Sequence, residues 1–218
     1  RPGSKRISAD EEIKRVIPIV RAIAKAFKIP VSVDTYKPLV AKQALDAGAC
    51  IINNIMGTTP DKKLFQLIKE YEAAIVLMHM KGSPRTMQAD PRYTDVVTEV
   101  RDHLLRRADT AVAAGVEAER ICLDPGIGFG KNLAQNLDLL GIGVAALVAT
   151  GHPVLVGASR KSFLERILGP IPAEERDTAT VAAHVLAIAG GVTAIRVHSV
   201  VEGLRSARVA DAIVRGTP

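Results

Sequence analysis

Tryptophan is absent from the sequence, and other aromatic residues are scarce. Phe, Tyr and Trp together make up 3% of the 218 residues. The core must therefore be built from Val, Ile, Leu and Ala, the residues that fill buried parallel strands and the helices covering them. Only two cysteines are present, Cys50 and Cys122, and each begins an apolar run without a partner at metal-ligand spacing. We expect both to be buried core thiols.

Long apolar runs are missing as well. No stretch reaches the about 18 consecutive apolar residues that a membrane-spanning helix needs. The opening residues, Arg-Pro-Gly-Ser, are typical of neither a signal peptide nor a transit peptide. These features predict a cytoplasmic protein with no membrane partner.

No block of like charge stands out. The formal net charge of +6 comes from 29 basic and 23 acidic residues, and no aromatic residues alternate with the basic ones. Solvated helix faces explain most of these charges, and a small phosphorylated ligand needs only a few of them. We therefore predict no nucleic-acid partner. Hydrophobic residues at 48% and charged residues at 24% are ordinary for one globular domain spanning residues 1–218.

The sequence does contain a regular alternation of two patterns. Nearly continuous apolar runs, typical of strands covered on both faces, occur at Val31–Asp34, Cys50–Ile55, Ala74–His79, Ile121–Asp124, Val154–Ala158 and Ala194–His198. Segments with helix start and stop signals accompany them, at about 10–27, 37–48, 61–71, 94–114, 133–150, 178–189 and 201–214. The repeating unit is a strand followed by a helix.

The placement of polar residues decides between the two folds built from this unit. An open doubly wound sheet gathers its ligand contacts at one switch point, whereas here polar side chains follow almost every strand, as at the top of a TIM (β/α)8 barrel. We therefore predict an α/β fold of the TIM-barrel type. Because a closed barrel has eight strands and six are visible, we expect the first two strands to lie upstream of Arg1.

Two strand ends carry acceptors suited to a ligand with N–H groups. Asp34 leaves a buried strand just before a helix begins, where it could bind a ligand or simply cap that helix. Asn53, together with Asn54, interrupts an apolar strand, and a buried amide needs partners for both its donor and its acceptor. A heterocycle with alternating donors and acceptors would supply them; a satisfied core asparagine is the alternative.

The segment Asp124–Lys131 places a carboxylate before closely spaced glycines. Gly126, Gly128 and Gly130 allow the backbone to come close to a ligand. Their spacing matches neither the Walker pattern nor the dinucleotide fingerprint, which disfavours those two nucleotide-binding folds.

Two later segments carry cations and an imidazole. Ser159–Ser162, which contains Lys161, follows one apolar run, and Arg196 and His198 alternate within the next, so both should face the same side. Together these groups could hold an anionic leaving group at the barrel mouth.

Taken in order, these segments resemble the motifs of the pterin-binding barrel family, and within it those of the dihydropteroate synthases. The resemblance covers the whole chain and rests on Arg1–Gly3, Ser32–Thr35, Ile52-Asn53, Leu77–Met80 with Gly82–Gln88, Asp124–Lys131, Ser159–Ser162 and Arg196–His198. It implies the condensation of 6-hydroxymethyl-7,8-dihydropterin diphosphate with 4-aminobenzoate, giving 7,8-dihydropteroate and diphosphate, with Mg²⁺ assisting. It also implies a homodimer formed through helices near the C-terminus, and a family targeted by sulfonamides.

The resemblance further implies which residues act. Those expected in catalysis are Asp34, Lys161, Arg196 and His198. Those expected to bind substrate are Arg1, Asn53, Met78, Asp124, Phe129, Gly157, Lys161, Ser162 and Arg196, and no protein ligand to a metal is assigned. In this scheme the carboxylates, Asn53 and Lys161 contact the pterin between walls made by Met78 and Phe129. Arg196 and His198 hold the diphosphate, and Ser162 meets the aminobenzoate carboxylate.

Two features depart from the family pattern. Asn54 stands where many members have Asp, and we expect the pterin contact to stay with Asn53. The chain also begins inside the family's second loop, so its first strand is expected upstream of Arg1. Two alternatives follow. A methyltetrahydrofolate:corrinoid methyltransferase should lack the cationic segments, because it holds no diphosphate. A non-catalytic pterin-binding module would keep the fold without the turnover.

Overall fold

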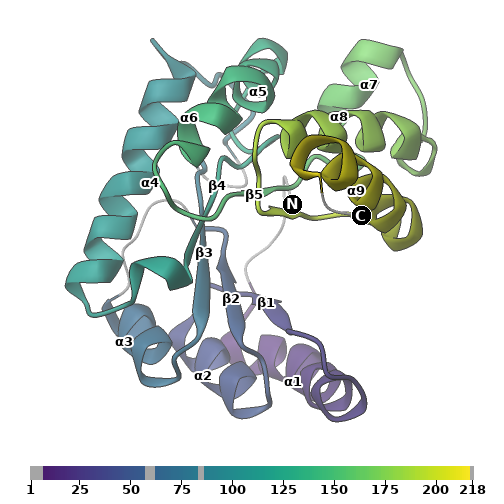
Figure 1. Cartoon of the computed structure of the whole chain (residues 1–218). Coiled ribbons are helices and arrows are strands. Elements are labelled where there is room, and N and C mark those ends of the chain that lie inside the picture. Colours follow the sequence, from purple (N-terminus) through teal and green to yellow (C-terminus); the bar gives the residue numbers. More distant parts are fainter. Residues whose placement is uncertain (1–6, 57–61, 83–85, 217–218) are drawn as a thin grey trace.

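The computed structural model describes residues 7–56, 62–82 and 86–216 of the chain (Figure 1). Its strands are β1 (Ser32–Asp34), β2 (Ile51–Asn54), β3 (Ala74–Met78), β4 (Ile121–Asp124), β5 (Leu155–Val156) and β6 (Ala194–Ile195). Its α-helices are α1 (Ala9–Ala26), α2 (Pro38–Asp46), α3 (Lys62–Glu70), α4 (Val96–Ala113), α5 (Leu133–Asp138), α6 (Val144–Val148), α7 (Ser162–Leu168), α8 (Asp177–Ala189) and α9 (Val200–Arg215). Every predicted strand is present, and most are shorter than predicted.

All strand pairs are parallel, so the strands end at the same edge. The first sheet has the order β1-β2-β3-β4, with Asp34 opposite Asn53 and Met78 opposite Asp124. β5 pairs with β6, and a parallel bridge between Leu123 and Val154 connects the two sheets. The sequential order of parallel strands is that of a TIM barrel. Within the described ranges, no backbone pairing joins β1 to β6, so the strands form an open arc.

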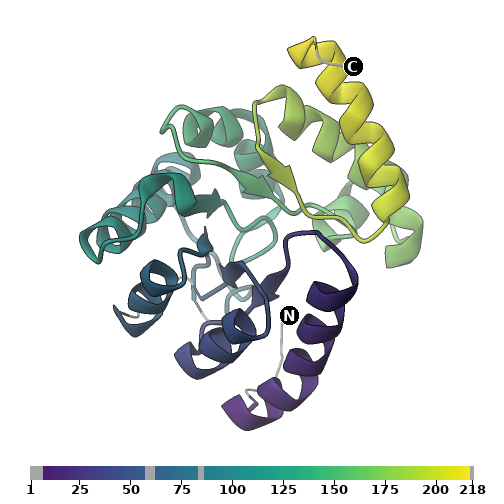
Figure 2. The ribbon, with the colours of Figure 1, turned by 60° about the horizontal axis from the view of Figure 1, so that its bottom comes forward.

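The helices surround this arc on its outer side (Figures 1 and 2). Alternate residues of β3 and β4, among them Leu77 and Leu123, are 0% exposed and belong to one continuous core that the helices share. Because side chains alternate along a strand, the intervening residues Met78 and Asp124 lie on the inner side. The core thus lies between strands and helices, and the inner side is left for polar groups at the strand ends.

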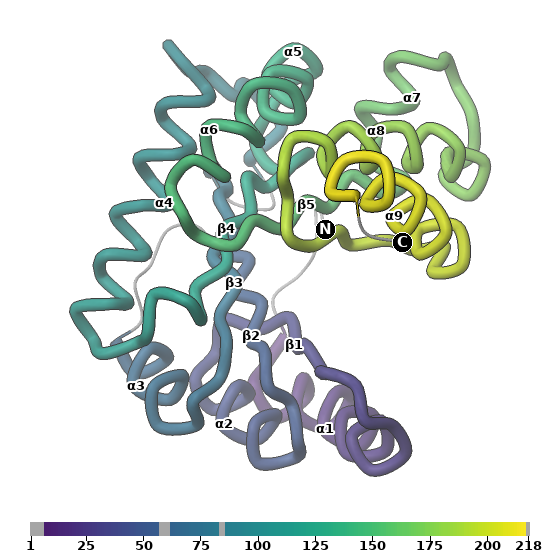
Figure 3. The backbone as a smooth tube through the Cα atoms, in the orientation of Figure 1, coloured from purple at the N-terminus to yellow at the C-terminus, as the bar shows by residue number. Residues whose placement is uncertain are grey.

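Local signals fix where several helices begin. Asp95 accepts from the backbone N–H groups of Val97 and Thr98 over 3.0 and 3.2 Å, which caps α4. Asn132 and Gln135 form a reciprocal capping box at the start of α5. The backbone tube in Figure 3 shows α1 and α9 at the two ends of the arc, the positions that flank its opening.

Three predictions require correction. The single helix expected over 133–150 is interrupted by a π-helical turn at Leu139–Gly143, and helix α7 was not predicted. Cys50 is exposed and Cys122 is half-buried, so neither is the fully buried thiol expected. Cys50 immediately precedes β2, whose first residue, Ile51, is itself only half-buried. That two further strands lie upstream of Arg1 remains a prediction, because the described residues do not test it.

Candidate active site

The ends of β1 and β2 place Asp34 beside Asn53. Asn53 Nδ2 donates to Asp34 Oδ1 over 2.9 Å, and the other Asp34 oxygen accepts from Arg196 Nη2 over 3.0 Å. Asp34 does not cap the next helix, because the N-cap position of α2 is Lys37, whose N–H donates to Thr35 Oγ1. The capping alternative is therefore wrong, and Asp34 joins two groups of the site.

Asn53 is only half satisfied. It is 5% exposed, and its Oδ1 is buried without a hydrogen-bond donor among the described residues. A buried acceptor left unpaired costs about 1–3 kcal/mol, so the satisfied core asparagine is also excluded. A ligand that offers an N–H to Asn53 Oδ1 would recover this free energy.

Asp124 supplies a second buried acceptor at the end of β4. It is 7% exposed, and Asp124 Oδ1 accepts from the backbone N–H of Gly126 over 2.7 Å. Burial raises the pKa of the Asp124 carboxyl, while the Lys161 charge and the Gly126 N–H oppose this shift. We call Asp34, Asn53 and Asp124 the acceptor arc, because together they present oxygen atoms on the inner side of the strands.

The glycines after Asp124 have conformations that other residues rarely adopt. Gly126 has φ +66° and Gly130 has φ +64°. A Cβ on Gly126 would lie 1.9 Å from the carbonyl oxygen of His79, so only glycine allows the loop to lie against the segment after β3. Gly128 N–H donates to Asn136 Oδ1 over 2.6 Å, which fixes the middle of the loop.

Met78 and Phe129 belong to a small apolar cluster separate from the main core. Met78, Met80 and Met87 are 2–3% exposed, and Phe129 packs against them with Ile55 and Met56. The structure thus brings the two residues predicted to form the apolar walls, Met78 and Phe129, into one cluster, and their contact with substrate stays a prediction. Their surfaces provide an apolar wall next to the acceptor arc.

Lys161 faces the same loop from the end of β5. Its Nζ donates to the carbonyl of Ile127 and lies 4.7 Å from the centroid of the Phe129 ring. Burial lowers the pKa of Lys161 to about 8, with Asp124 acting in the opposite direction. A Cβ on Gly157 would lie 3.6 Å from Arg196 Cβ and 3.9 Å from Lys161 Nζ, so this glycine leaves room between the two cations.

Arg160 holds the turn that presents Lys161. The backbone of Arg160 lies in the left-handed region, at φ +57°, which is unfavourable for a residue with a side chain. Its guanidinium forms a two-pronged ion pair with Asp177, over 2.8 and 2.7 Å, and its N–H donates to Thr180 Oγ1 over 3.0 Å. These contacts with α8 keep the turn in place against its backbone strain.

Arg196 and His198 follow β6 rather than alternating within it, because the strand ends at Ile195. Arg196 reaches Asp34, whereas His198 Nδ1 lies 2.9 Å from Ser159 Oγ. Both are exposed, as is Ser162, the first residue of α7. We call Lys161, Arg196 and His198 the cationic arc. Arg1, also predicted to bind substrate, lies outside the described residues.

Two buried side chains of this region were not assigned a role from the sequence. Lys131 is 2% exposed and contacts His79 and two carbonyls of the glycine loop. Asn136 is 3% exposed and bonds Gly128. A lysine directly after three glycines was the available signal for Lys131, but its burial could not be read from that pattern.

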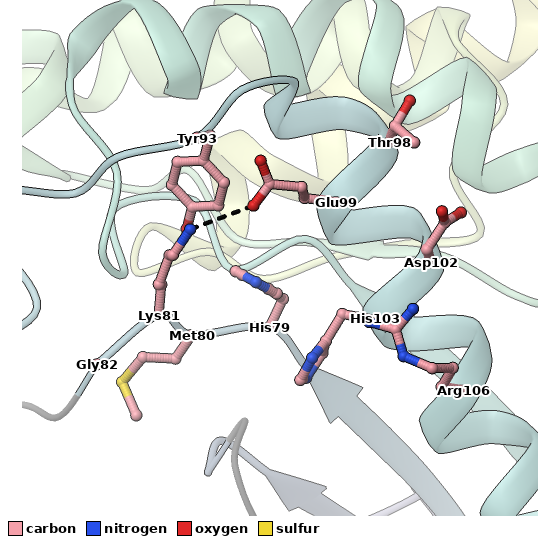
Figure 4. Close-up of a pocket in the computed structure, with 10 residues that line it drawn as sticks. All are labelled: His79, Met80, Lys81, Gly82, Tyr93, Thr98, Glu99, Asp102, His103 and Arg106. Atoms are coloured by element: carbon pink, nitrogen blue, oxygen red, sulfur yellow. Dashed lines mark hydrogen bonds and ion pairs between the residues drawn. The ribbon is translucent and has the colours of Figure 1, made fainter.

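A groove of about 400 Å³ lies beside α4 and is lined by none of the predicted site residues (Figure 4). Two of its charged groups pair with one another: Lys81 Nζ lies 3.2 Å from Glu99, and it also lies 4.1 Å from the centroid of the Tyr93 ring. His79 forms part of its wall. The groove is therefore lined by neither arc, although His79, which lines it, also contacts Lys131 at the end of the glycine loop.

Comparison with known proteins shows the family to which this chain belongs. A model of pterin-binding enzymes matches residues 1–198, and the chain belongs to this family. It is 42% identical over 215 residues to the dihydropteroate synthase of Synechocystis, covering 99% of this chain and 74% of that protein. Among solved structures, a Yersinia pestis dihydropteroate synthase with a sulfonamide drug complex has a TM-score of 0.93 at 37% identity, covering 100% of this chain and 78% of that one.

The Thermus thermophilus dihydropteroate synthase in complex with 4-aminobenzoate is also similar. Its TM-score is 0.89 at 41% identity, and the match covers 98% of this chain and 80% of that one. These likenesses confirm the predicted family and the TIM-barrel type of fold. No helix in the described ranges is long and apolar enough to cross a membrane.

Proposed function

We propose that this chain is a dihydropteroate synthase, a transferase of folate biosynthesis. It condenses 6-hydroxymethyl-7,8-dihydropterin diphosphate with 4-aminobenzoate, and the products are 7,8-dihydropteroate and diphosphate. The observation that carries the proposal is the juxtaposition of an unpaired buried acceptor, Asn53 Oδ1, with a cationic arc. The first feature matches the N–H groups of a pterin edge, and the second matches a departing diphosphate.

The acceptor arc would bind and orient the pterin. Asn53 Oδ1 and the Asp124 carboxylate are buried oxygens, and a ring with several N–H groups satisfies them where water is excluded. The carboxylates of Asp34 and Asp124 would also stabilise the positive charge that develops on the ring and its methylene carbon as the bond to diphosphate breaks. Met78 and Phe129 would cover the apolar faces of the ring.

The cationic arc would hold the leaving group. Arg196 and His198 are exposed at the same edge and supply donors for phosphate oxygens, while Lys161 lies between them and the loop that carries Phe129. The aromatic amine of 4-aminobenzoate is neutral at pH 7 and needs no general base to make it nucleophilic. The site therefore works by positioning and by electrostatic stabilisation, with Ser162 proposed to meet the aminobenzoate carboxylate.

Release of diphosphate tests this function. The chain, incubated with both substrates, should form diphosphate and dihydropteroate in equal amounts, and omission of 4-aminobenzoate should abolish dihydropteroate formation. Binding of the pterin without turnover would instead identify a non-catalytic module. Transfer of a methyl group from methyltetrahydrofolate would favour the methyltransferase alternative, for which the cationic arc has no evident use.

Magnesium is a separate part of the proposal. The described residues do not fit a protein-only site, because they contain no cluster of three His, Cys, Asp or Glu side chains able to hold a metal. Mg²⁺ commonly binds through substrate phosphates with few protein ligands. We propose that it enters on the diphosphate oxygens of the substrate. Titration with EDTA should then weaken binding of the pterin diphosphate but not of the pterin without diphosphate.

We also propose a cytoplasmic homodimer formed through the C-terminal helices. Leu186 on α8 and Val209 and Ile213 on α9 are 69%, 61% and 78% exposed, more than a solvated helix face requires. Light scattering should give twice the chain mass for the wild type and the chain mass for Ile213→Glu. Ile19→Glu on α1, which is also exposed, is the matched control. A monomeric wild type would contradict the dimer.

A further inference from the structure

A buried lysine ties the glycine loop to the neighbouring strand end. Lys131 Nζ lies 3.0 Å from His79 Nδ1 and donates to the carbonyl oxygens of Gly126 and Phe129 over 3.0 and 2.9 Å. Burial lowers the pKa of Lys131 to about 7, and below that pH its ammonium group has three N–H donors, each with one acceptor here. Among the described residues, no carboxylate lies within ion-pair distance of this group, so its partners are the loop and an imidazole.

The state of His79 fits this contact. Burial, first, and the Lys131 charge, second, lower the pKa of His79 to about 2, so the ring is neutral. Nδ1 then accepts from Lys131 and the proton lies on Nε2. Figure 4 shows His79 just after β3, next to the ring of His103. The lysine therefore bridges two strand ends, β3 through His79 and β4 through the loop.

The loop that Lys131 holds carries three parts of the proposed site. It begins at Asp124, its Ile127 carbonyl accepts from Lys161, and its Phe129 ring packs on Met78. Lys131 Nζ donates a hydrogen bond near each end of this loop, to the carbonyl oxygens of Gly126 and Phe129. A shift of the loop would move an acceptor, a cation and an apolar wall together.

We propose that Lys131 is a positioning residue of the pterin site, which fixes the loop 124–130 against His79 without touching the substrate. The proposal rests on the function proposed above. Its expected signature is a loss of pterin affinity that exceeds any change for 4-aminobenzoate, because the loop contributes to the pterin side of the site.

The experiment compares Lys131→Met with wild type and with Lys81→Met. Lys81 is a nearby lysine whose Nζ pairs with Glu99 in the groove, so the control removes the same charge without removing a side-chain hydrogen bond to the loop. Lys131→Met should raise the dissociation constant of 6-hydroxymethylpterin about tenfold and leave the KM for 4-aminobenzoate nearly unchanged. Lys81→Met should change neither. Equal losses for both substrates, or a lower active fraction with unchanged KM values, would overturn the proposal.

Substitutions of His79 provide a second test, which stays informative if the Lys131→Met variant does not fold. His79→Asn keeps an acceptor near the position of Nδ1 and should retain pterin affinity, whereas His79→Leu should lose it to the same extent as Lys131→Met. Equal affinity in the two His79 variants would count against the proposal. Pterin binding is measured without turnover, so absence of synthase activity in the wild type would refute the proposed reaction and leave the Lys131 result interpretable.

Discussion

In the acceptor arc, Asn53 and Asp124 are 5% and 7% exposed, whereas in the cationic arc the side chain of Arg196 is 61% exposed. Each arc has one member that departs from this contrast, since the Asp34 side chain is 43% exposed and Lys161 is half-buried. The difference fits the ligand proposed for each region. A neutral heterocycle is recognised through directional hydrogen bonds, which are most selective where water is excluded. A diphosphate is strongly hydrated, and exposed cations can bind it without the large cost of burying several charges. Asp34 joins the two regions by bonding Asn53 and Arg196.

The largest effect is expected in the acceptor arc. Asp124→Asn keeps the size of the side chain but removes a buried charge and turns a donor toward ligand N–H groups. We expect kcat/KM for the pterin substrate to fall about 10²–10³-fold, measured by diphosphate release. Asp90→Asn, on an exposed carboxylate outside the arc, is the control. Wild-type activity in Asp124→Asn would remove the acceptor arc from the mechanism.

A smaller and more selective effect is expected in the cationic arc. Arg196→Met should raise the KM for the pterin diphosphate about tenfold, because one charged donor to phosphate is lost at an exposed position. Affinity for the same pterin without diphosphate should remain close to wild type. Arg15→Met, on an exposed arginine of α1 outside the proposed dimer surface, serves as the control. An equal loss for both pterins would mean that the two arcs are not separate in function.

The pH dependence of activity tests Lys161, the half-buried member of the cationic arc. Its pKa is lowered to about 8 by burial, so the ammonium is lost as the pH rises through that value. If the charged form is needed, kcat/KM for the pterin diphosphate should fall above about pH 8. Lys161→Arg retains its charge and should move this fall to higher pH. An unchanged profile would assign the titration to another group, of which Lys131, lowered to about 7, is the nearest.

The smallest effect concerns the turn behind the cationic arc. Arg160→Gly and Arg160→Ala both lose the ion pair with Asp177, but only glycine accepts the left-handed backbone without strain. The glycine variant should therefore be more stable than the alanine variant by about 1 kcal/mol in the free energy of unfolding, measured by urea denaturation. Equal stability would mean that the turn changes shape once Arg160 is removed.

The sequence predicted the strands well because parallel strands buried on both faces are recognisable as continuous apolar runs. Residues at their ends were also predicted, since the end of such a run is a fixed position in the fold. Helix α7 was not, because it starts directly at the Lys161 turn and is only 7 residues long. The ion pair between Asp34 and Arg196 spans 162 positions, and no local pattern encodes such a contact.

Burial within the site was the other property that sequence could not supply. Lys131 and Asn136 look like ordinary polar residues in a glycine-rich segment, yet they are 2% and 3% exposed. Their role depends on glycine conformations that bring the loop against His79, and these arise only in the folded chain. For Cys50 the error was the reverse. Its apolar neighbours in the sequence led to the prediction of a buried thiol, yet Cys50 is exposed.

The unpaired oxygen of Asn53 has a consequence for analogue selection. A compound that replaces the facing ring N–H by a C–H would have nearly the same shape as the pterin, yet it would leave this acceptor without a partner in the complex as well. Sites built around such a hydrogen bond reject the isostere lacking it far more strongly than they reject a missing methylene. Inhibitors of this protein should therefore be ranked by their donor pattern before their apolar area.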